Sequence, residues 1–206
     1  QHSTAYDFYV RSDCGADGYS TWAGPSGFMT LCDVMAAPFV ENFSGGSVSC
    51  WSFPDGQGNW NFGDLYTPPS SSSGSPNAYF NKSPILTDYS YSLVSPIIDA
   101  ADLSVVHMDF ILFLNNSSNS SFEQLTVECK GIDAGNWLMV EMFNNSGLGS
   151  GNMEFVREGL VLPGMQGQQF QVRFRAHGAN SNSINGWGLN DIAIYEGGLQ
   201  ASITIE

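Results

Sequence analysis

The stretch Gly186-Trp187-Gly188-Leu189-Asn190-Asp191-Ile192-Ala193-Ile194-Tyr195-Glu196 decides the fold of this chain. Two glycines flank a tryptophan, and a single acid follows before an apolar run. This pattern is typical of a glycine-flanked turn that leads into a strand. The stretch therefore predicts a β-protein whose last strand begins beside Asp191.

Alternation of apolar and polar residues extends this prediction along the chain. Apolar residues occupy every second position in 106–114, 125–129 and 170–176, which is the period of a β-strand. Further strands are expected near 91–94, 137–143 and 188–195, and no stretch has the period of an amphipathic helix. The predicted fold class is all-β, a β-sandwich of about ten antiparallel strands joined by polar loops.

Two further motifs stand near the start of the predicted sandwich, Phe39-Val40-Glu41-Asn42-Phe43 and Cys50-Trp51. Together with residues 186–196 they resemble the MAM-like modules of secreted bacterial proteins and the cleaved-adhesin domains of gingipains. The resemblance covers residues 38–197 and implies a jelly roll. It departs from the family pattern at Asn190, where the first Asp of a pair is usual.

The two ends of the chain resemble parts of other modules. Residues 4–31 resemble the last two strands of a fibronectin type III domain, with Tyr6 as the corner tyrosine and with Phe8 and Val10 facing inward. The expected domains are a fibronectin-like hairpin at 1–33, the jelly roll at 38–197, and a linker or the start of a following module at 198–206. This division predicts a larger, modular parent protein with neighbouring domains on the same polypeptide.

Charge and composition limit the possible partners. The chain has 206 residues, of which 20 are acidic and 6 are basic, and its formal net charge is −14. That charge repels nucleic acid and anionic lipid surfaces. No apolar run approaches the roughly 18 residues that span a bilayer. We therefore expect an extracellular, secreted or cell-surface protein that neither binds nucleic acid nor inserts into a membrane.

The cysteines are Cys14, Cys32, Cys50 and Cys129, and their spacing is not that of a metal site. An even number in a secreted chain predicts two disulfides. Three connectivities are possible. Pairing Cys14 with Cys32 closes a short loop and leaves Cys50 with Cys129 in the sandwich, while buried free thiols are the alternative.

Signals for catalysis are weak. The chain has neither an H-E-x-x-H nor a G-x-S-x-G motif. Asp109 and Glu128 would form a glycosidase pair only if they faced one groove, whereas acids on strand surfaces are usually solvated. The sequence therefore predicts a protein that is not an enzyme.

A calcium site is the strongest metal hypothesis. First and last strands of a jelly roll lie side by side, so Glu41 and Asp191, with Asn190, would offer oxygen ligands to Ca²⁺. The family resemblance implies the same positions, and the alternative is a surface Glu and a turn-capping Asp. A second, weaker candidate is Asp55, Asn59 and Asp64, with Gln57 between them.

Two surfaces are candidates for ligand binding. Trp60 lies in a loop of glycines and amides, where an exposed ring would stack on a sugar, while Trp22, Trp51, Trp137 and Trp187 are assigned to the core. Arg173, Arg175 and His177 share one strand face and would meet anionic groups of a glycan. The alternative for these bases is cross-strand pairing with Glu123, Glu128 or Glu141.

The predicted function is that of a noncatalytic adhesion or glycan-binding module, stabilised by calcium, whose partner is a polysaccharide or a cell-surface glycan or protein. Three alternatives stay open. The chain would otherwise be an accessory domain of a secreted peptidase or polysaccharide-degrading enzyme, or a spacer without a ligand. Sequons at 42–44, 116–118 and 144–146 would fit a eukaryotic receptor module.

Overall fold

A computed structural model of the chain describes residues 5–29, 32–44, 48, 50–117 and 121–198. Its contacts form two compact units, Gln1–Asp33 and Val34–Glu206. Most of the expected module start at 198–206 lies outside the described residues. Among those that are described, no helix is long and apolar enough to cross a membrane.

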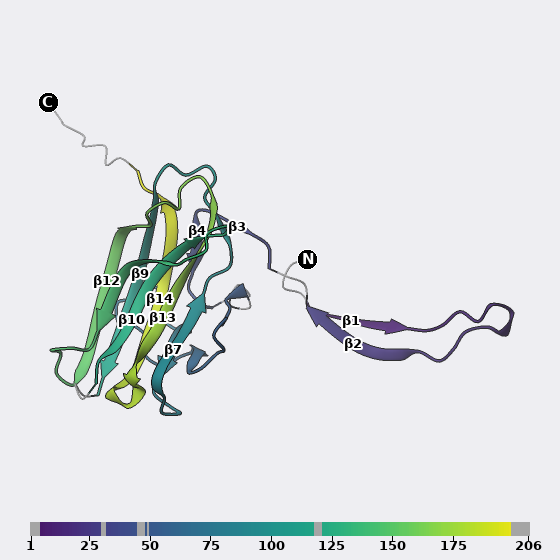
Figure 1. Ribbon diagram of the computed structural model, residues 1–206, viewed down its shortest axis with the longest axis horizontal. Helices are drawn as coiled ribbons and strands as arrows, with labels where there is room; N and C mark the ends of the chain where they lie inside the picture. The colour runs from purple at the N-terminus through teal and green to yellow at the C-terminus, as the bar shows by residue number, and fades with distance from the viewer. Residues whose placement is uncertain (1–4, 30–31, 45–47, 49, 118–120, 199–206) are drawn as a thin grey trace. The chain divides into compact units, whose positions relative to one another are not determined.

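The first unit is a two-stranded antiparallel hairpin of β1 (Ala5–Val10) and β2 (Ala23–Met29), with the short 3-10 helix η1 (Gly15–Asp17) between them (Figure 1). The rings of Tyr6 and Phe28 stack 5.5 Å apart. The inward orientation expected for Phe8 and Val10 is wrong, because these side chains are 46% and 55% exposed. Trp22, expected in a core, is also exposed. Two strands alone cannot enclose an interior.

The second unit is a sandwich of two six-stranded sheets, which confirms the all-β prediction (Figure 1). The first sheet has the order β11-β10-β13-β8-β3, with β7 also beside β13. Its strands are β3 (Met35–Ala36), β7 (Thr87–Val94), β8 (Ile98–Asp99), β10 (Glu123–Gly131), β11 (Leu138–Asn144) and β13 (Gln169–Asn180). One pair, β3 with β8, is parallel, so the sandwich is not wholly antiparallel.

The second sheet has the order β12-β9-β14-β6-β5, with β4 beside β14. Its strands are β4 (Phe39–Glu41), β5 (Trp60–Gly63), β6 (Asn77–Asn81), β9 (Val106–Asn116), β12 (Gly151–Val161) and β14 (Ile184–Glu196). The short 3-10 helix η3 (Ser181–Ser183) leads from β13 into β14. As expected, the first strand of the resembled region, β4, pairs with the last strand, β14.

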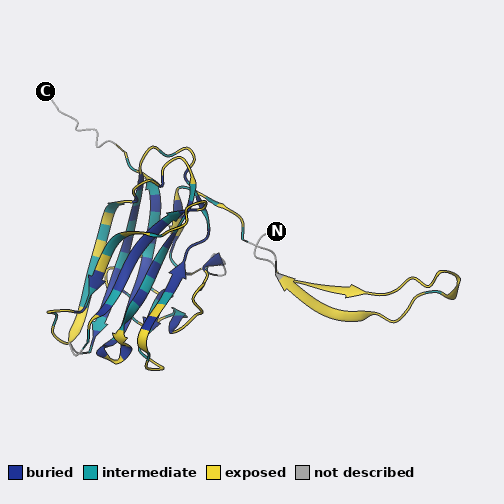
Figure 2. Cartoon of the chain, in the orientation of Figure 1, coloured by how far each residue is buried: buried dark blue, intermediate teal, exposed yellow. Residues whose placement is uncertain are grey.

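The core lies between the two sheets and follows the predicted alternation. Figure 2 shows buried and less buried residues alternating along the strands. The ring of Phe110 on β9 packs edge-on against Phe174 on β13 at 5.6 Å and against Phe143 on β11 at 6.1 Å. Burial of such rings is the main contribution to the stability of the sandwich.

The glycines of the Gly186-Trp187-Gly188 motif allow a close approach by another segment. A Cβ atom at Gly188 would collide with the backbone carbonyl of Tyr66, and one at Gly186 would collide with the Tyr66 ring. Trp187 between them points the other way and is fully buried. The motif thus packs a loop on one side of β14 and a core tryptophan on the other.

The cysteines differ from the prediction of two disulfides. Cys32 and Cys50 are disulfide-bonded, whereas Cys14 is an exposed thiol and Cys129 a buried one. Cys129 faces the core from β10, and burial raises the pKa of its thiol to about 11. Apolar surroundings keep such a thiol protonated and inert. Both expected pairings, Cys14 with Cys32 and Cys50 with Cys129, are wrong, since Cys14 and Cys129 are free.

Candidate functional site

The outer side of β10 and β13 collects charged side chains because of strand alternation. On these strands Leu125, Val127 and Phe174 face the core, so the residues between them face away from it. Antiparallel register places Glu128 opposite Arg173. We call this surface the basic face, defined by Glu128, Lys130, Trp137, Arg173, Arg175 and His177.

Glu128 joins the two arginines of the basic face. Its carboxylate accepts hydrogen bonds from Arg173 Nε and from Arg175 Nη2, the latter at 3.0 Å. Burial raises the pKa of Glu128, but the hydrogen bonds from Arg175 and Arg173 outweigh it and leave the pKa below its usual value. The pairing with Glu128 is therefore confirmed, and it holds both guanidinium groups in fixed positions.

Trp137 lies over this charged array and was wrongly assigned to the core. Its ring centroid is 4.5 Å from Arg173 Cζ and 5.0 Å from Lys130 Nζ, and the residue is partly exposed. Met139 and Met142 follow on β11 and are 58% and 42% exposed. A signal for this arrangement was present in the sequence, since Lys130 is the last outward position of β10 before the turn that leads to Trp137.

His177 completes the basic face at the far end of β13. Its Nε2 atom is buried and has no hydrogen-bond partner in the described structure. Burial, and then the nearby charge of Arg175, lowers the pKa of His177. The imidazole is therefore held in its neutral form to a lower pH than in an unfolded chain.

Trp60, the predicted sugar-stacking residue, is in the core. It is 0% exposed, its Nε1 donates to Tyr91 O at 3.0 Å, and its ring packs edge-on against Phe80 at 5.6 Å. The loop before it is anchored by Asn59, whose Nδ2 donates to Asn81 O and Pro84 O. The amides that suggested an exposed loop thus bind backbone carbonyls and fold the loop inward.

Glu41 and Asp191 do not share a site in this arrangement. Glu41 is 1% exposed, and its two oxygens accept from Phe43 N at 2.6 Å and Trp51 Nε1 at 2.9 Å. Its carboxylate is enclosed in the core, whereas Asp191 is partly exposed and contacts a different segment. The Glu41 of the E-x-F motif therefore fits a structural role rather than a calcium site shared with Asp191.

Asp191 has different surroundings. It has a positive φ of 50° at an irregularity of β14, and its carboxylate accepts from Ser72 N at 2.6 Å and Ser73 Oγ at 2.5 Å. Burial raises its pKa, but the hydrogen bonds from Ser73 and Ser72 lower it by more. Asn190 is buried and donates to Gly74 O at 2.6 Å. Asn190 and Asp191 thus anchor the serine-rich loop at residues 70–75.

The second predicted metal set is not assembled either. Asn59 is 2% exposed and is used in anchoring its loop, while Asp55 and Asp64 are exposed. Among the residues that the structure describes, no three His, Cys, Asp or Glu side chains are grouped to hold a metal ion. The set therefore does not have the geometry of a calcium loop.

The carboxylates considered for glycoside hydrolysis lie on opposite sides of the sandwich. Glu128 is on the basic face, whereas Asp109 is on the outer side of β9, where it accepts from Tyr195 Oη at 2.8 Å and from Gly159 N at 2.6 Å. A cavity of about 480 Å³ beside it is lined by His107, Asp109, Glu158, Gly159, Tyr195 and Gly198. Two acids that flank one glycosidic bond must share a groove, so this pair is excluded.

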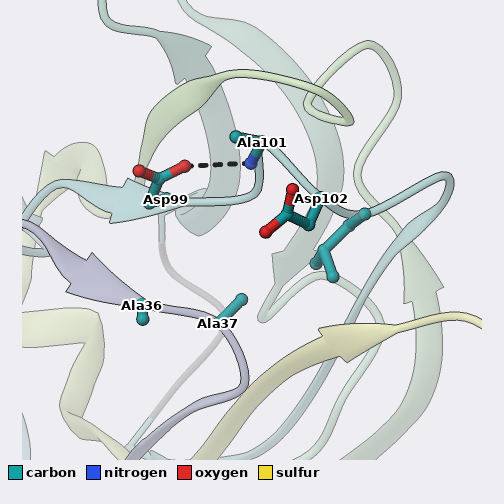
Figure 3. Close-up of a pocket in the computed structure, with 6 residues that line it drawn as sticks. Ala36, Ala37, Asp99, Ala101 and Asp102 are labelled. Carbon is teal, nitrogen blue, oxygen red and sulfur yellow. Dashed lines mark hydrogen bonds between the residues drawn. The ribbon is translucent and has the colours of Figure 1, made fainter.

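A smaller pocket lies where β3 and β8 end. Figure 3 shows its lining residues, Ala36, Ala37, Asp99, Ala101, Asp102 and Leu103. Its volume is about 180 Å³, below the roughly 300 Å³ at which ligand sites usually begin. Asp99 is engaged with Ala101 N at 2.9 Å and Gln169 Nε2 at 3.2 Å. This pocket is therefore not a candidate ligand site.

No protein-family model and no curated protein matches the sequence. Among solved structures, the K1 cleaved adhesin domain of Lys-gingipain from Porphyromonas gingivalis W83 is similar, with a TM-score of 0.53 and 18% identity over 78% of this chain and 98% of that domain. The K3 domain of the same protein has a TM-score of 0.52 and 18% identity over 77% of this chain and 98% of that domain. The C-terminal family 22 carbohydrate binding module of Clostridium thermocellum Xyn10B has a TM-score of 0.45 and 10% identity over 81% of this chain and 96% of that module.

The likeness to the two gingipain domains concerns the fold alone. It agrees with the resemblance drawn from residues 39–43 and 186–196, and it confirms a jelly-roll β-sandwich of the cleaved-adhesin type. The role of the basic face depends on this chain's own residues.

Proposed function

We propose that the sandwich unit is a noncatalytic glycan-binding module of a secreted or surface-anchored protein, and that it binds through the basic face. The observation that carries this proposal is Trp137, a partly exposed residue whose ring lies beside Lys130 and Arg173 and next to two exposed methionines. The apolar C–H face of a pyranose packs on such a ring, and the neighbouring N–H donors bind its hydroxyl groups.

The rigidity of this surface supports recognition rather than catalysis. Glu128, the carboxylate in its centre, is held by both arginines and is therefore poorly placed to transfer a proton. Side chains fixed by strands and ion pairs lose little conformational entropy when a ligand binds. An open sheet surface of this kind suits an extended polysaccharide chain.

An extracellular location is part of the proposal. The disulfide-bonded Cys32 and Cys50 are typical of an oxidising compartment, and the net charge of −14 disfavours nucleic acid and anionic membranes as partners.

Calcium binding is a further part of the proposal. Asp191 with the hydroxyls of Ser72 and Ser73 offers hard oxygen atoms at one loop, and we propose weak, stabilising Ca²⁺ binding there.

The test is glycan binding by the wild type and by Trp137→Ala on a polysaccharide array and in affinity gels. We expect the substitution to weaken binding at least about fivefold, because loss of a stacking contact on an aromatic ring costs on the order of 1–3 kcal/mol. Trp22→Ala removes another exposed tryptophan, in the hairpin unit, and should bind as the wild type does. Failure of the wild type to bind any glycan, or undiminished binding by Trp137→Ala, would overturn the proposal.

A further inference from the structure

The basic face is an exception in a strongly acidic chain. It contains Lys130, Arg173 and Arg175, which are three of the six lysine and arginine residues in the sequence. Glu128 neutralises one of these three charges through its contacts with both arginines. The face therefore keeps a positive charge while the molecule as a whole carries a net charge of −14.

Several donors of the basic face are free to bind a ligand. Within the described part of the chain, Arg173 uses Nε and Arg175 uses Nε and Nη2, all toward Glu128. The terminal Nη1 and Nη2 of Arg173, Nη1 of Arg175 and Nζ of Lys130 have no hydrogen-bond acceptor among the described residues. These groups donate only, so they fit an acceptor-only anion better than a hydroxyl, which both donates and accepts.

From this arrangement we infer that the basic face selects acidic glycans, those that carry carboxylate or sulfate groups. The inference rests on the proposed glycan-binding function. Trp137 packs on a sugar ring, while Lys130 and the arginine pair bind the acidic substituent of that ring or of its neighbour. Glu128 acts as a positioning residue, because it orients the guanidinium groups toward the ligand without touching it.

The overall charge sharpens this selectivity. An acidic glycan is repelled by most of the molecule and attracted at one surface, so the position and direction of binding are restricted. Attraction of this kind is screened by salt within about 10 Å at 0.1 M ionic strength. Binding of acidic glycans should therefore weaken as salt rises, whereas binding of neutral glycans should not.

The experiment measures dissociation constants for two acidic polysaccharides, polygalacturonate and dextran sulfate, and for two neutral ones, mannan and xylan. Each is measured at about 0.02 M and about 0.3 M NaCl, on either side of the screening range. Lys130→Gln removes one charge of the face without disturbing Glu128. Lys82→Gln is the matched control, since Lys82 follows β6 in the other sheet, where it donates to Asn185 Oδ1 at 2.9 Å.

We expect the wild type to bind an acidic polysaccharide at least about tenfold more tightly than the neutral ones at low salt. Lys130→Gln should weaken acidic binding about three- to tenfold and weaken neutral binding by less, because glutamine keeps an N–H donor for sugar hydroxyls. Lys82→Gln should match the wild type. Preference for polygalacturonate identifies carboxylate as the group recognised, and preference for dextran sulfate identifies sulfate.

Two outcomes separate this inference from the function on which it rests. Equal binding of neutral and acidic polysaccharides, insensitive to salt and to Lys130→Gln but lost in Trp137→Ala, overturns the selectivity and leaves glycan binding standing. Absence of binding to all four polysaccharides and on the wider array overturns both. A loss in Lys82→Gln equal to that in Lys130→Gln would mean that net charge, not the basic face, governs the preference.

Discussion

The two outer surfaces of the sandwich use ionisable side chains in opposite ways. On the basic face, one acid is shared by two arginines beneath Trp137. On the outer side of β9, β12 and β14, which we call the acidic face, Asp109, Glu158 and Asp191 line neighbouring pockets, and Asp109 accepts from neutral donors, the Tyr195 hydroxyl and Gly159 N–H. That hydrogen bond raises the pKa of Tyr195.

The comparison shows that one strand pattern serves both surfaces. The inward residues of the long strands are mostly apolar, so the outward positions are free to differ without changing the fold. Binding properties of such a sandwich therefore follow from a few outward residues rather than from the architecture. The two faces should therefore respond differently when their outward residues are substituted.

The largest expected difference in stability is between substitution of Trp60 in the core and substitution of Trp137 on the basic face. Trp60→Ala should destabilise the protein by about 3–5 kcal/mol, because it leaves a large cavity in the core. Trp137→Ala should cost less than about 1 kcal/mol, since its ring is partly solvated and contacts two cations. Urea unfolding of both variants measures the difference. Similar losses in the two variants would place Trp137 among the residues that hold the fold together.

The next effect compares the central acids of the two faces. Glu128→Ala should cost about 2–3 kcal/mol, because it leaves two neighbouring guanidinium groups without their counterion in a site that is only partly exposed. Asp109→Ala should cost about 1 kcal/mol, since its hydrogen-bond partners are reachable by water. Urea unfolding of each variant against wild type gives the two losses. A larger loss for Asp109→Ala would mean that the neutral donors of the acidic face stabilise the fold more than the ion pairs of Glu128 do.

A smaller effect concerns pH. The pKa of His177 is lowered in the folded state, so the unfolded chain takes up this proton first as the pH falls, and stability should decline below about pH 6.5. The pKa values of Glu128 and Asp191 are also lowered, and their contributions are present above about pH 4 and lost as the pH falls further.

His177→Gln should reduce the decline in the free energy of unfolding between about pH 6.5 and pH 5, because glutamine does not titrate. Urea unfolding at several pH values across that range measures the slope. If the slope persists in His177→Gln, its assignment to this residue is incorrect.

The smallest expected effect is that of calcium on the acidic face. With a dissociation constant near 1 mM, about 5 mM Ca²⁺ adds about 1 kcal/mol to stability. Thermal unfolding in chelator and in calcium should show a modest rise in Tm that is absent in Asp191→Asn. Identical melting of the wild type in both buffers would remove calcium from the proposed function.

The sequence was sufficient for the fold and for half of the basic face. Alternation located the core and placed Arg173, Arg175 and His177 on one outward strand surface, because strand geometry alone fixes these directions. The sequence was not sufficient to predict which tryptophans are buried. Trp60 is inside because Asn59 donates to two backbone carbonyls, one at the end of β6 and one after it. That contact depends on tertiary structure and not on the polarity of the loop.

Trp137 was missed for the complementary reason. An isolated tryptophan after a polar turn favours burial by composition, and only the register of β10 against β11 and β13 brings Lys130 and Arg173 beside its ring. The predicted cysteine pairing was wrong for the same reason, since Cys129 remains a free thiol because it faces the core from β10. Register and loop path are set by long-range contacts, which local patterns do not contain.

The two free cysteines differ so much in access that the wild type already contains a single labelling position. A maleimide dye should attach to Cys14, which is exposed in the hairpin unit, and leave Cys129, which is 0% exposed in the core of the other unit. Fluorescence anisotropy of that dye would then report polysaccharide capture through slower tumbling. The label lies in a different unit from Trp137, so the unaltered sequence can serve as its own reporter.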